Sequence, residues 1–246
     1  MLRSLSTCGA FDLRRSHDVG LSSRPVEPTV TGVGVIDKAA RILAAVEERP
    51  LDLTSLIVET GLPRATAHRL AVALEGHGLL RRDADGRFAP GLRLVALGRA
   101  AAQALQLPDA ARPALEELRD RTGESAQLYV RDGDVRVCVV SLESPHGLRT
   151  IVPVGAALPL DAGSAGHVLS GDTGDGTGWI DSVGEREAGV ASVSAPVISP
   201  DGQVIAAVSV SGPIDRIGRE PGARHGDAVV AAAHAVEGAL GRVAPG

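Results

Sequence analysis

The hydrophobic residues recur at two different spacings, and the change of spacing divides the chain. From about residue 35 to residue 76 they lie three to four positions apart, which is typical of helices with one buried face. Three short helices are predicted there, over about 35–49, 53–60 and 63–76. Asp52 can cap the second helix, Gly61 can end it, and Pro63 suits the first turn of the third. Two short extended arms around Asp85-Gly86 then predict a hairpin.

The remaining residues alternate between helical and extended patterns. The predicted helices are 92–105, 108–122, 162–169 and 226–240. The predicted strands or extended segments are 125–131, 135–141, 149–154, 158–160, 190–197 and 204–211. Residues 171–178, with four glycines, predict a loop, and residues 1–30 have no periodicity and predict a disordered tail or an over-extended start. Helices, a hairpin, strands and helices in this order indicate the α+β class.

Three helices followed by a hairpin is the order of a winged helix-turn-helix, which we assign to residues 31–90. In that motif the third helix enters the major groove of double-stranded DNA. The residues expected to contact bases or nearby phosphates on this helix are Arg64, Ala65, Thr66, His68 and Arg69. The residues expected to contact phosphates from the hairpin are Arg81, Arg82 and Arg87. Taken alone, these charged residues could simply form a solvent-exposed helix face. The helix order, the tight turn and the hairpin together favour a DNA-binding surface instead.

The net charge of −5 first argues against a nucleic-acid partner, but the charge is unevenly distributed. Residues 31–106 carry ten basic and eight acidic groups, a net of +2, whereas residues 107–246 carry a net of −8. Because +2 is weak for a DNA-binding unit, dimerisation through the helix of residues 91–106 is expected to double the phosphate contacts. The four aromatic residues cannot form a base-stacking platform, which argues against single-stranded nucleic acid.

Two cysteines exclude a disulfide framework and a four-thiolate zinc site, and the histidines lack metal-binding spacing. We therefore expect no metal and no cofactor. No apolar run is long enough to cross a bilayer and no secretory signal is evident, so a soluble cytoplasmic protein without membrane contact is expected.

Residues 162–166 approximate a nucleophile elbow, so a serine hydrolase using Ser164 is one alternative. A protein-interaction module with a degenerate winged helix is another, and it predicts no salt-sensitive DNA binding.

Several segments carry a family resemblance: 32–39, 60–70 and 74–78 in the first part, and 123–128, 154–160 and 208–213 in the second. Together they resemble the IclR family of transcriptional regulators over about residues 31–243. Residues 184–187 and 189–196 resemble the actinobacterial branch associated with amino-acid, especially leucine, biosynthesis genes. The resemblance implies a homodimer or tetramer that represses or activates transcription. It also implies a GAF-like effector-binding domain, here residues 107–246, that binds a small metabolite.

Clustered serines beside the last strands suggest where a metabolite binds. Ser209 and Ser211 are two positions apart, so they face the same side of a strand, where buried hydroxyls need partners. The alternative is that these hydroxyls bond to nearby backbone or face water. The resemblance implies that an effector carboxylate, from a small organic acid or amino-acid-related compound, is held by backbone amides of the loop-to-helix turn. The expected effector-binding residues are Ser164, Ala165, Gly166, Val190, Ser192, Ser209 and Ser211.

One departure from the family affects this site. Only nine residues separate Leu169 from Trp179, where the family usually has a much longer helical insert that helps to wall the pocket. The shorter segment predicts an altered pocket and weaker metabolite binding than in relatives. Tight binding of a small acid in calorimetry would contradict this hypothesis.

Overall fold

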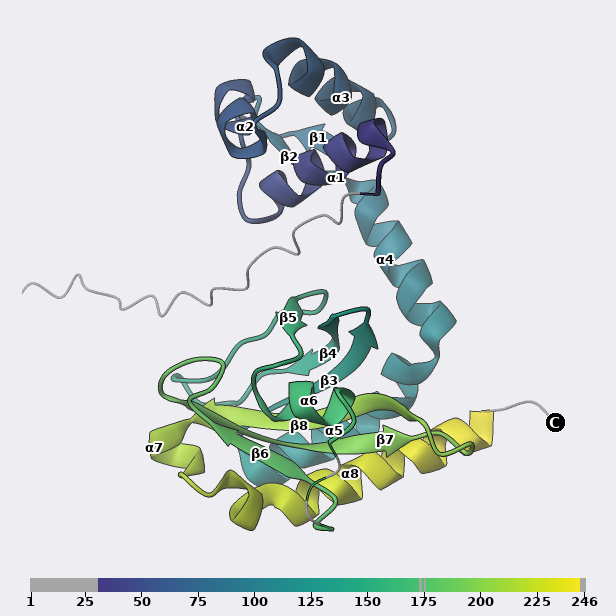
Figure 1. Ribbon diagram of the computed structural model, residues 1–246, viewed down its shortest axis with the longest axis vertical. Helices are drawn as coiled ribbons and strands as arrows, with labels where there is room; N and C mark the ends of the chain where they lie inside the picture. Colours follow the sequence, from purple (N-terminus) through teal and green to yellow (C-terminus); the bar gives the residue numbers. More distant parts are fainter. Residues whose placement is uncertain (1–30, 173, 175, 244–246) are drawn as a thin grey trace, which may run out of the picture.

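The computed structural model describes residues 31–172, 174 and 176–243, so the tail predicted over 1–30 lies outside the described residues. The chain forms an N-terminal unit and a C-terminal unit joined by one helix, α4 (Figure 1). The N-terminal unit contains α1 (Gly34–Glu47), α2 (Leu53–Thr60), α3 (Arg64–Gly76), β1 (Leu80–Arg82) and β2 (Phe88–Pro90). The joining helix α4 is Leu92–Leu105, as the sequence predicted.

Local sequence signals set the ends of the N-terminal helices. Asp52 caps α2 by accepting a hydrogen bond of 2.7 Å from the amide of Ser55. Gly61 ends α2 in the left-handed conformation, with φ of 63°, which suits a residue without a side chain. Pro63 lies one position before α3, at its N-cap, and not inside the first turn as predicted. The three helices and the hairpin enclose a core that includes Ile42, Leu56 and Phe88.

The start of α4 is attached closely to the N-terminal unit. The amide of Gly91 donates to the carbonyl of Leu79 at 2.9 Å, and the amide of Arg93 donates to the carbonyl of Gly78 at 3.3 Å. A Cβ atom on Gly91 would lie 2.0 Å from the Gly78 carbonyl oxygen, so only glycine fits without moving the backbone. The first turn of α4 is therefore held against the end of α3 and the start of β1.

The C-terminal unit is built on a six-stranded antiparallel sheet in the order β5-β4-β3-β8-β7-β6. The strands are β3 (Ser125–Asp132), β4 (Val135–Leu142), β5 (Ala157–Pro159), β6 (Ile180–Val183), β7 (Val190–Ile198) and β8 (Val204–Pro213). The helices are α5 (Leu107–Thr122), α6 (Ser164–Leu169), α7 (Ile214–Ile217) and α8 (Pro221–Val243). This helix-turn-helix unit followed by an antiparallel sheet with helices confirms the predicted α+β class.

The two faces of the sheet are covered differently. One face packs against α5 and α8 through aliphatic side chains such as Leu115, Val208 and Val236. The other face lies under α6, where Tyr129 and Cys138 pack with Val168 in a smaller cluster. Cys138 is fully buried, as the sequence suggested, and burial raises the pKa of its thiol to about 12.

Some predicted elements differ from the structure. Residues 149–154 were predicted to be extended, but they form no strand, since they make no ladder of hydrogen bonds with a neighbouring strand. The last helix starts at Pro221 and not at Gly226, and strand β6 and helix α7 were not predicted. The described residues between α6 and β6 form turns, in agreement with the predicted loop.

Candidate nucleic-acid interface and ligand site

The exposed face of α3 carries the residues predicted to read DNA. Ala67, Ala71 and Leu74 point into the core. The opposite face is open to solvent, and its residues are Arg64, Ala65, His68 and Arg69, with Thr66 partly exposed beside them. Arg64 lies in the first turn and has no hydrogen-bond or ion-pair partner among the described residues, so its guanidinium remains available to a ligand. In the helix-turn-helix motif this first turn is the part that approaches base edges.

The three hairpin arginines differ in how far they are already engaged. Arg87 pairs with Asp83 at 2.9 Å and with Asp85 at 2.7 Å, and its hydrogen bond to Asp83 raises the pKa of Arg87. Arg82 lies over the Phe88 ring, 3.6 Å from its centroid, and donates to the Gly86 carbonyl. Arg81 is exposed and forms no ion pair with any described residue. Arg81 is therefore the hairpin cation with the most freedom to contact a phosphate.

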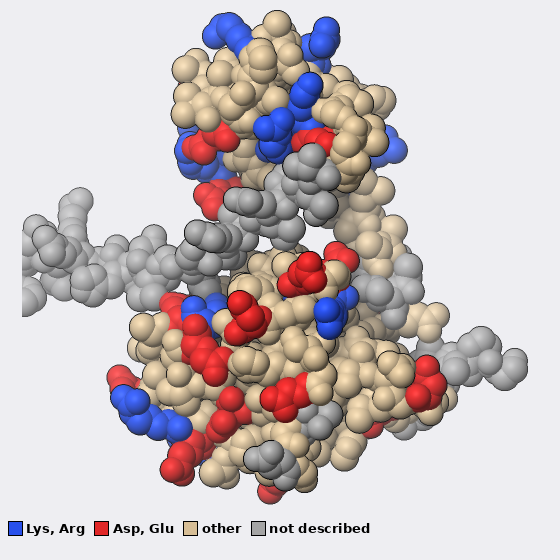
Figure 2. Space-filling model, viewed as in Figure 1, with Lys and Arg blue, Asp and Glu red and all other residues tan. Residues whose placement is uncertain are grey.

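The two units also differ in surface charge. On the face shown in Figure 2, Lys and Arg gather over the N-terminal unit, whereas Asp and Glu predominate over the C-terminal unit. The picture agrees with the opposite net charges of the two parts of the sequence. An anionic polymer such as DNA is attracted to the N-terminal unit and repelled by the other.

A small cavity lies on the α6 side of the sheet and is lined by most of the predicted effector residues. Its volume is about 20 Å³. The lining residues that the sequence predicted are Ser164, Ala165, Val190, Ser192, Ser209 and Ser211. Gly166, in the first turn of α6, is outside this lining, and its amide donates to the carbonyl of Gly163.

The serines satisfy one another through a chain of hydroxyl hydrogen bonds. Ser164 Oγ lies 2.8 Å from Ser192 Oγ and 2.7 Å from Ser194 Oγ. Ser194 donates to Ser209 at 2.9 Å. Ser211 donates instead to Gln127 Oε1 at 3.1 Å, while the Gln127 amide nitrogen is buried without a partner. Ser164, Ser194, Ser209 and Ser211 are buried and bond to side chains, whereas Ser192 is partly exposed. These hydroxyls can exchange partners with a bound ligand.

The backbone amide of Gly163, just before α6, is already hydrogen-bonded to a carboxylate of the chain. Glu185 Oε2 accepts from the Gly163 amide at 2.9 Å and contacts His167 Nε2 at 2.7 Å. Burial opposes ionisation of Glu185, but these two hydrogen bonds outweigh it and hold its pKa below the usual range. A carboxylate of the chain thus lies next to the amides of Ser164, Ala165 and Gly166, to which the resemblance assigned an effector carboxylate, but it binds the preceding amide, that of Gly163.

Sequence reasoning missed five residues of the cavity lining: Tyr129, Arg136, Gly163, Ser182 and Arg186. Arg136 could have been found from the strand pattern. It is two positions before Cys138, for which burial was expected, so its side chain faces the same side of β4. Ser182 and Arg186 lie on and after β6, a strand that was itself not predicted.

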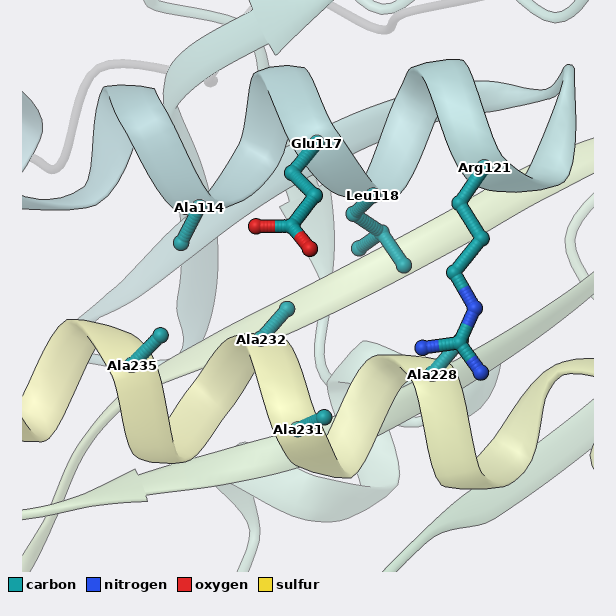
Figure 3. A pocket seen from close by; sticks show the side chains of 8 residues that line it. All are labelled: Ala114, Glu117, Leu118, Arg121, Ala228, Ala231, Ala232 and Ala235. Atoms are coloured by element: carbon teal, nitrogen blue, oxygen red, sulfur yellow. The ribbon is translucent and has the colours of Figure 1, made fainter.

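A larger cavity, of about 60 Å³, lies between α5 and α8 on the other side of the sheet (Figure 3). Its lining is mostly alanine methyl groups, with the exposed Glu117 and Arg121 at its border. The figure shows both charged side chains descending from α5 toward the alanines of α8. Because few polar groups converge there, we place the candidate ligand site at the smaller cavity.

The arrangement does not support catalysis by Ser164. Its hydroxyl bonds to serines, and among the described residues no histidine accepts its proton. His225 and His234, the predicted partners, lie on α8, which packs on the other face of the sheet. Within the described ranges, no group of three potential ligands could hold a metal ion, and no helix is long and apolar enough to cross a membrane.

Comparison with known proteins agrees with both units. The family model "IclR helix-turn-helix domain" matches residues 35–84. The model "Bacterial transcriptional regulator IclR C-terminal" matches residues 99–175 and 172–237, two pieces that meet in the short segment after α6.

Relatives match along most of their length. The HTH-type transcriptional regulator KipR of Bacillus subtilis is 28% identical over 212 residues, which are 72% of this chain and 85% of KipR. The glycerol operon regulatory protein of Streptomyces griseus is 28% identical over 217 residues, 74% of this chain and 85% of that protein.

A solved structure shares the fold. The IclR homolog from Microbacterium hydrocarbonoxydans, complexed with 4-hydroxybenzoate, aligns with a TM-score of 0.74 at 23% identity and covers 85% of this chain and 99% of its own. The family models together span more than half of the chain. The chain therefore belongs to the IclR family of transcriptional regulators, and it is a DNA-binding regulator and not an enzyme.

Proposed function

We propose that the protein acts as a homodimer that binds a palindromic operator through two α3 helices and responds to a small metabolite in the C-terminal unit. The observation that carries this proposal is the solvent-exposed face of α3, with Arg64 in its first turn and without a partner among the residues that the structure describes. Arg64 and Thr66 contact base edges in this arrangement, while His68 and Arg69 contact bases or nearby phosphates.

The proposed regulon is a set of amino-acid biosynthesis genes, leucine genes among them, because residues 184–187 and 189–196 resemble the branch associated with them. The test is footprinting of genomic DNA with the purified full chain, with and without intermediates of these pathways. We expect protected sites with two related half-sites about one helical turn apart. DNA binding that is absent, or that does not weaken as salt rises, would contradict the proposal and favour a protein-interaction role.

Dimerisation is supported by apolar side chains that α1 and α4 leave in solvent. Val35 and Ile36 on α1 are 60% and 59% exposed, and Leu92 and Val95 on α4 are 77% and 70% exposed. Leu92 and Val95 are three positions apart and therefore lie on one side of α4, and clustered exposed aliphatic side chains are typical of an interaction surface. A second copy of the chain is the partner that would also double the phosphate contacts of a weakly basic unit.

Replacing Val95 by glutamate should convert the dimer to a monomer in sedimentation measurements without DNA, because a charge would be buried in the interface. Val58→Glu is the matched control, since Val58 on α2 is 77% exposed and lies away from α1 and α4 in sequence. The proposed dimer interface on α1 and α4 is wrong if Val95→Glu leaves the molecular mass unchanged, or if both variants dissociate the dimer to the same extent.

Arg81 and Arg87 of the hairpin should contribute to the binding of every DNA sequence by similar factors. Arg81→Ala is expected to weaken binding to operator and random DNA by similar factors and to reduce the salt slope by about one per contact. Arg87→Ala should act in the same direction but less strongly, because Arg87 is already paired with two aspartates. Both effects are measured by titrating the two DNAs at several salt concentrations. A loss confined to the operator would assign these residues to base reading.

A further inference from the structure

Arg136 is a cation buried in the C-terminal unit without a counter-ion. Its side chain lies on β4 and the residue is only 3% exposed. It forms no ion pair with any described residue, and Asp161 and Glu185 act on it only from a distance. Burial, and the nearby positive charge of Arg186, lower the pKa of Arg136. A buried charge without a partner is costly, and it is relieved when an anion binds beside it.

The guanidinium is hydrogen-bonded along one side only. Nη1 donates to the carbonyls of Pro159 and Ala162, at the turn that leads into α6. Nε is buried without an acceptor, and no hydrogen bond among the described residues involves Nη2. Nε and Nη2 form the side of a guanidinium that binds a carboxylate through two parallel hydrogen bonds. That side of Arg136 is the one left without partners.

The cavity beside Arg136 suits a carboxylate in chemistry and in size. Arg186, Ser164 and Ser192 line it together with Arg136, so a second cation and hydroxyl donors are at hand. Its volume of about 20 Å³ exceeds the minimum for a single water, so there is room for a small polar group beside the guanidinium. Arg186, Val190 and Ser192 are only partly buried and lie where the rest of a short ligand can extend.

The turn at the start of α6 is less suited to the anion. Glu185 already occupies the Gly163 amide, so a ligand carboxylate on the neighbouring amides of Ser164 and Ala165 would lie close to a like charge. The close packing of this turn on the Arg136 guanidinium fixes the position of that group and favours it as the anion-binding group. A Cβ on Gly166 would lie 2.3 Å from Arg136 Nη1, and a Cβ on Gly163 would lie 3.2 Å from Nη2. Glycine at both positions lets the guanidinium lie directly under the turn.

We propose that Arg136 determines the specificity of the effector site by binding the carboxylate of a small aliphatic acid through Nε and Nη2. This inference rests on the effector role of the C-terminal unit proposed above and names the ligand class for that site. The small size of the cavity favours a short acid, and neutral compounds are disfavoured because they leave the guanidinium without a counter-ion.

The test is calorimetric titration of the full chain with acetate, propionate and pyruvate, with acetamide as the neutral analogue and inorganic phosphate as a competing anion. We expect at least one of the three acids to bind, and neither acetamide nor phosphate to do so. Arg136→Gln should weaken binding of that acid about tenfold or more, because two charge-assisted hydrogen bonds are lost. Arg112→Gln is the matched control, since Arg112 is an exposed arginine on α5 outside the cavity.

Arg136→Lys keeps the charge but lacks the paired donors, so it should also weaken binding, and it decides the question if Arg136→Gln does not fold. The proposal is overturned if a folded Arg136 variant binds the acid as tightly as the original chain. It is equally overturned if acetamide or phosphate binds as well as the acids, or if none of the three acids binds. Operator binding without added acid is measured on the same samples, so failure of DNA recognition is seen separately from failure of this inference.

Discussion

Replacing Arg64 by alanine is expected to weaken operator binding by about 1–3 kcal/mol for each α3 helix and to relax the preference for the operator sequence. Arg64 is exposed in the first turn of α3 and has no partner within the described part of the protein, so its donors are available to a guanine edge. A dimer loses the contact twice. The measurement is a binding titration of operator and random DNA at one fixed salt concentration.

Arg112→Ala serves as the control, because it removes the same charge from an exposed site on α5. It should leave the ratio between operator and random DNA unchanged. If Arg64→Ala weakened both DNAs by the same factor, Arg64 would be a phosphate contact, and base reading would have to come from another residue of α3.

Arg216→Ala is expected to destabilise the C-terminal unit by about 3–5 kcal/mol, because it leaves the Glu124 carboxylate buried and unpaired. Glu124 is 2% exposed at the start of β3, and Arg216 on α7 holds both of its oxygens at 2.5 and 2.7 Å. Arg216 also donates to the carbonyl of Leu148 at 2.9 Å. Urea denaturation followed by the fluorescence of Trp179, the single tryptophan, reports on this unit directly.

Arg149→Ala removes a pair of similar geometry on the surface. Arg149 and Glu143 are 2.6 Å apart with side chains 32% and 48% exposed, so less than about 1 kcal/mol should be lost. Equal losses from Arg216→Ala and Arg149→Ala would mean that burial of Glu124 does not make its ion pair important for stability.

The N-terminal unit could be predicted closely because its signals are local. Asp52 and Gly61 mark the ends of α2 through contacts within three or four residues. The buried stripe of α3 follows directly from helical spacing, which is why Arg64 and His68 were expected on the open face. The length of α4 was likewise readable from a stretch rich in Ala and Leu.

The ligand site could be predicted only in part because its chemistry depends on distant contacts. Ser209 and Ser211 share a face through strand alternation, which the sequence shows. Glu185 meets the Gly163 amide across 22 positions, and Arg136 reaches the Ala162 carbonyl across 26. No spacing rule covers such separations, so neither the internal carboxylate nor the unpaired guanidinium could be derived from the sequence.

Gly91 and Arg93 attach the N-terminal end of α4 to the residues that follow α3. The helix therefore acts as a lever arm whose N-terminal end is fixed to the DNA-binding unit. At about 1.5 Å per residue, its 14 residues span about 21 Å. A tilt of about 10° at the far end then displaces α3 by about 3.7 Å, close to the rise of one base pair. A rotation that small is enough to move a recognition helix out of register with its half-site.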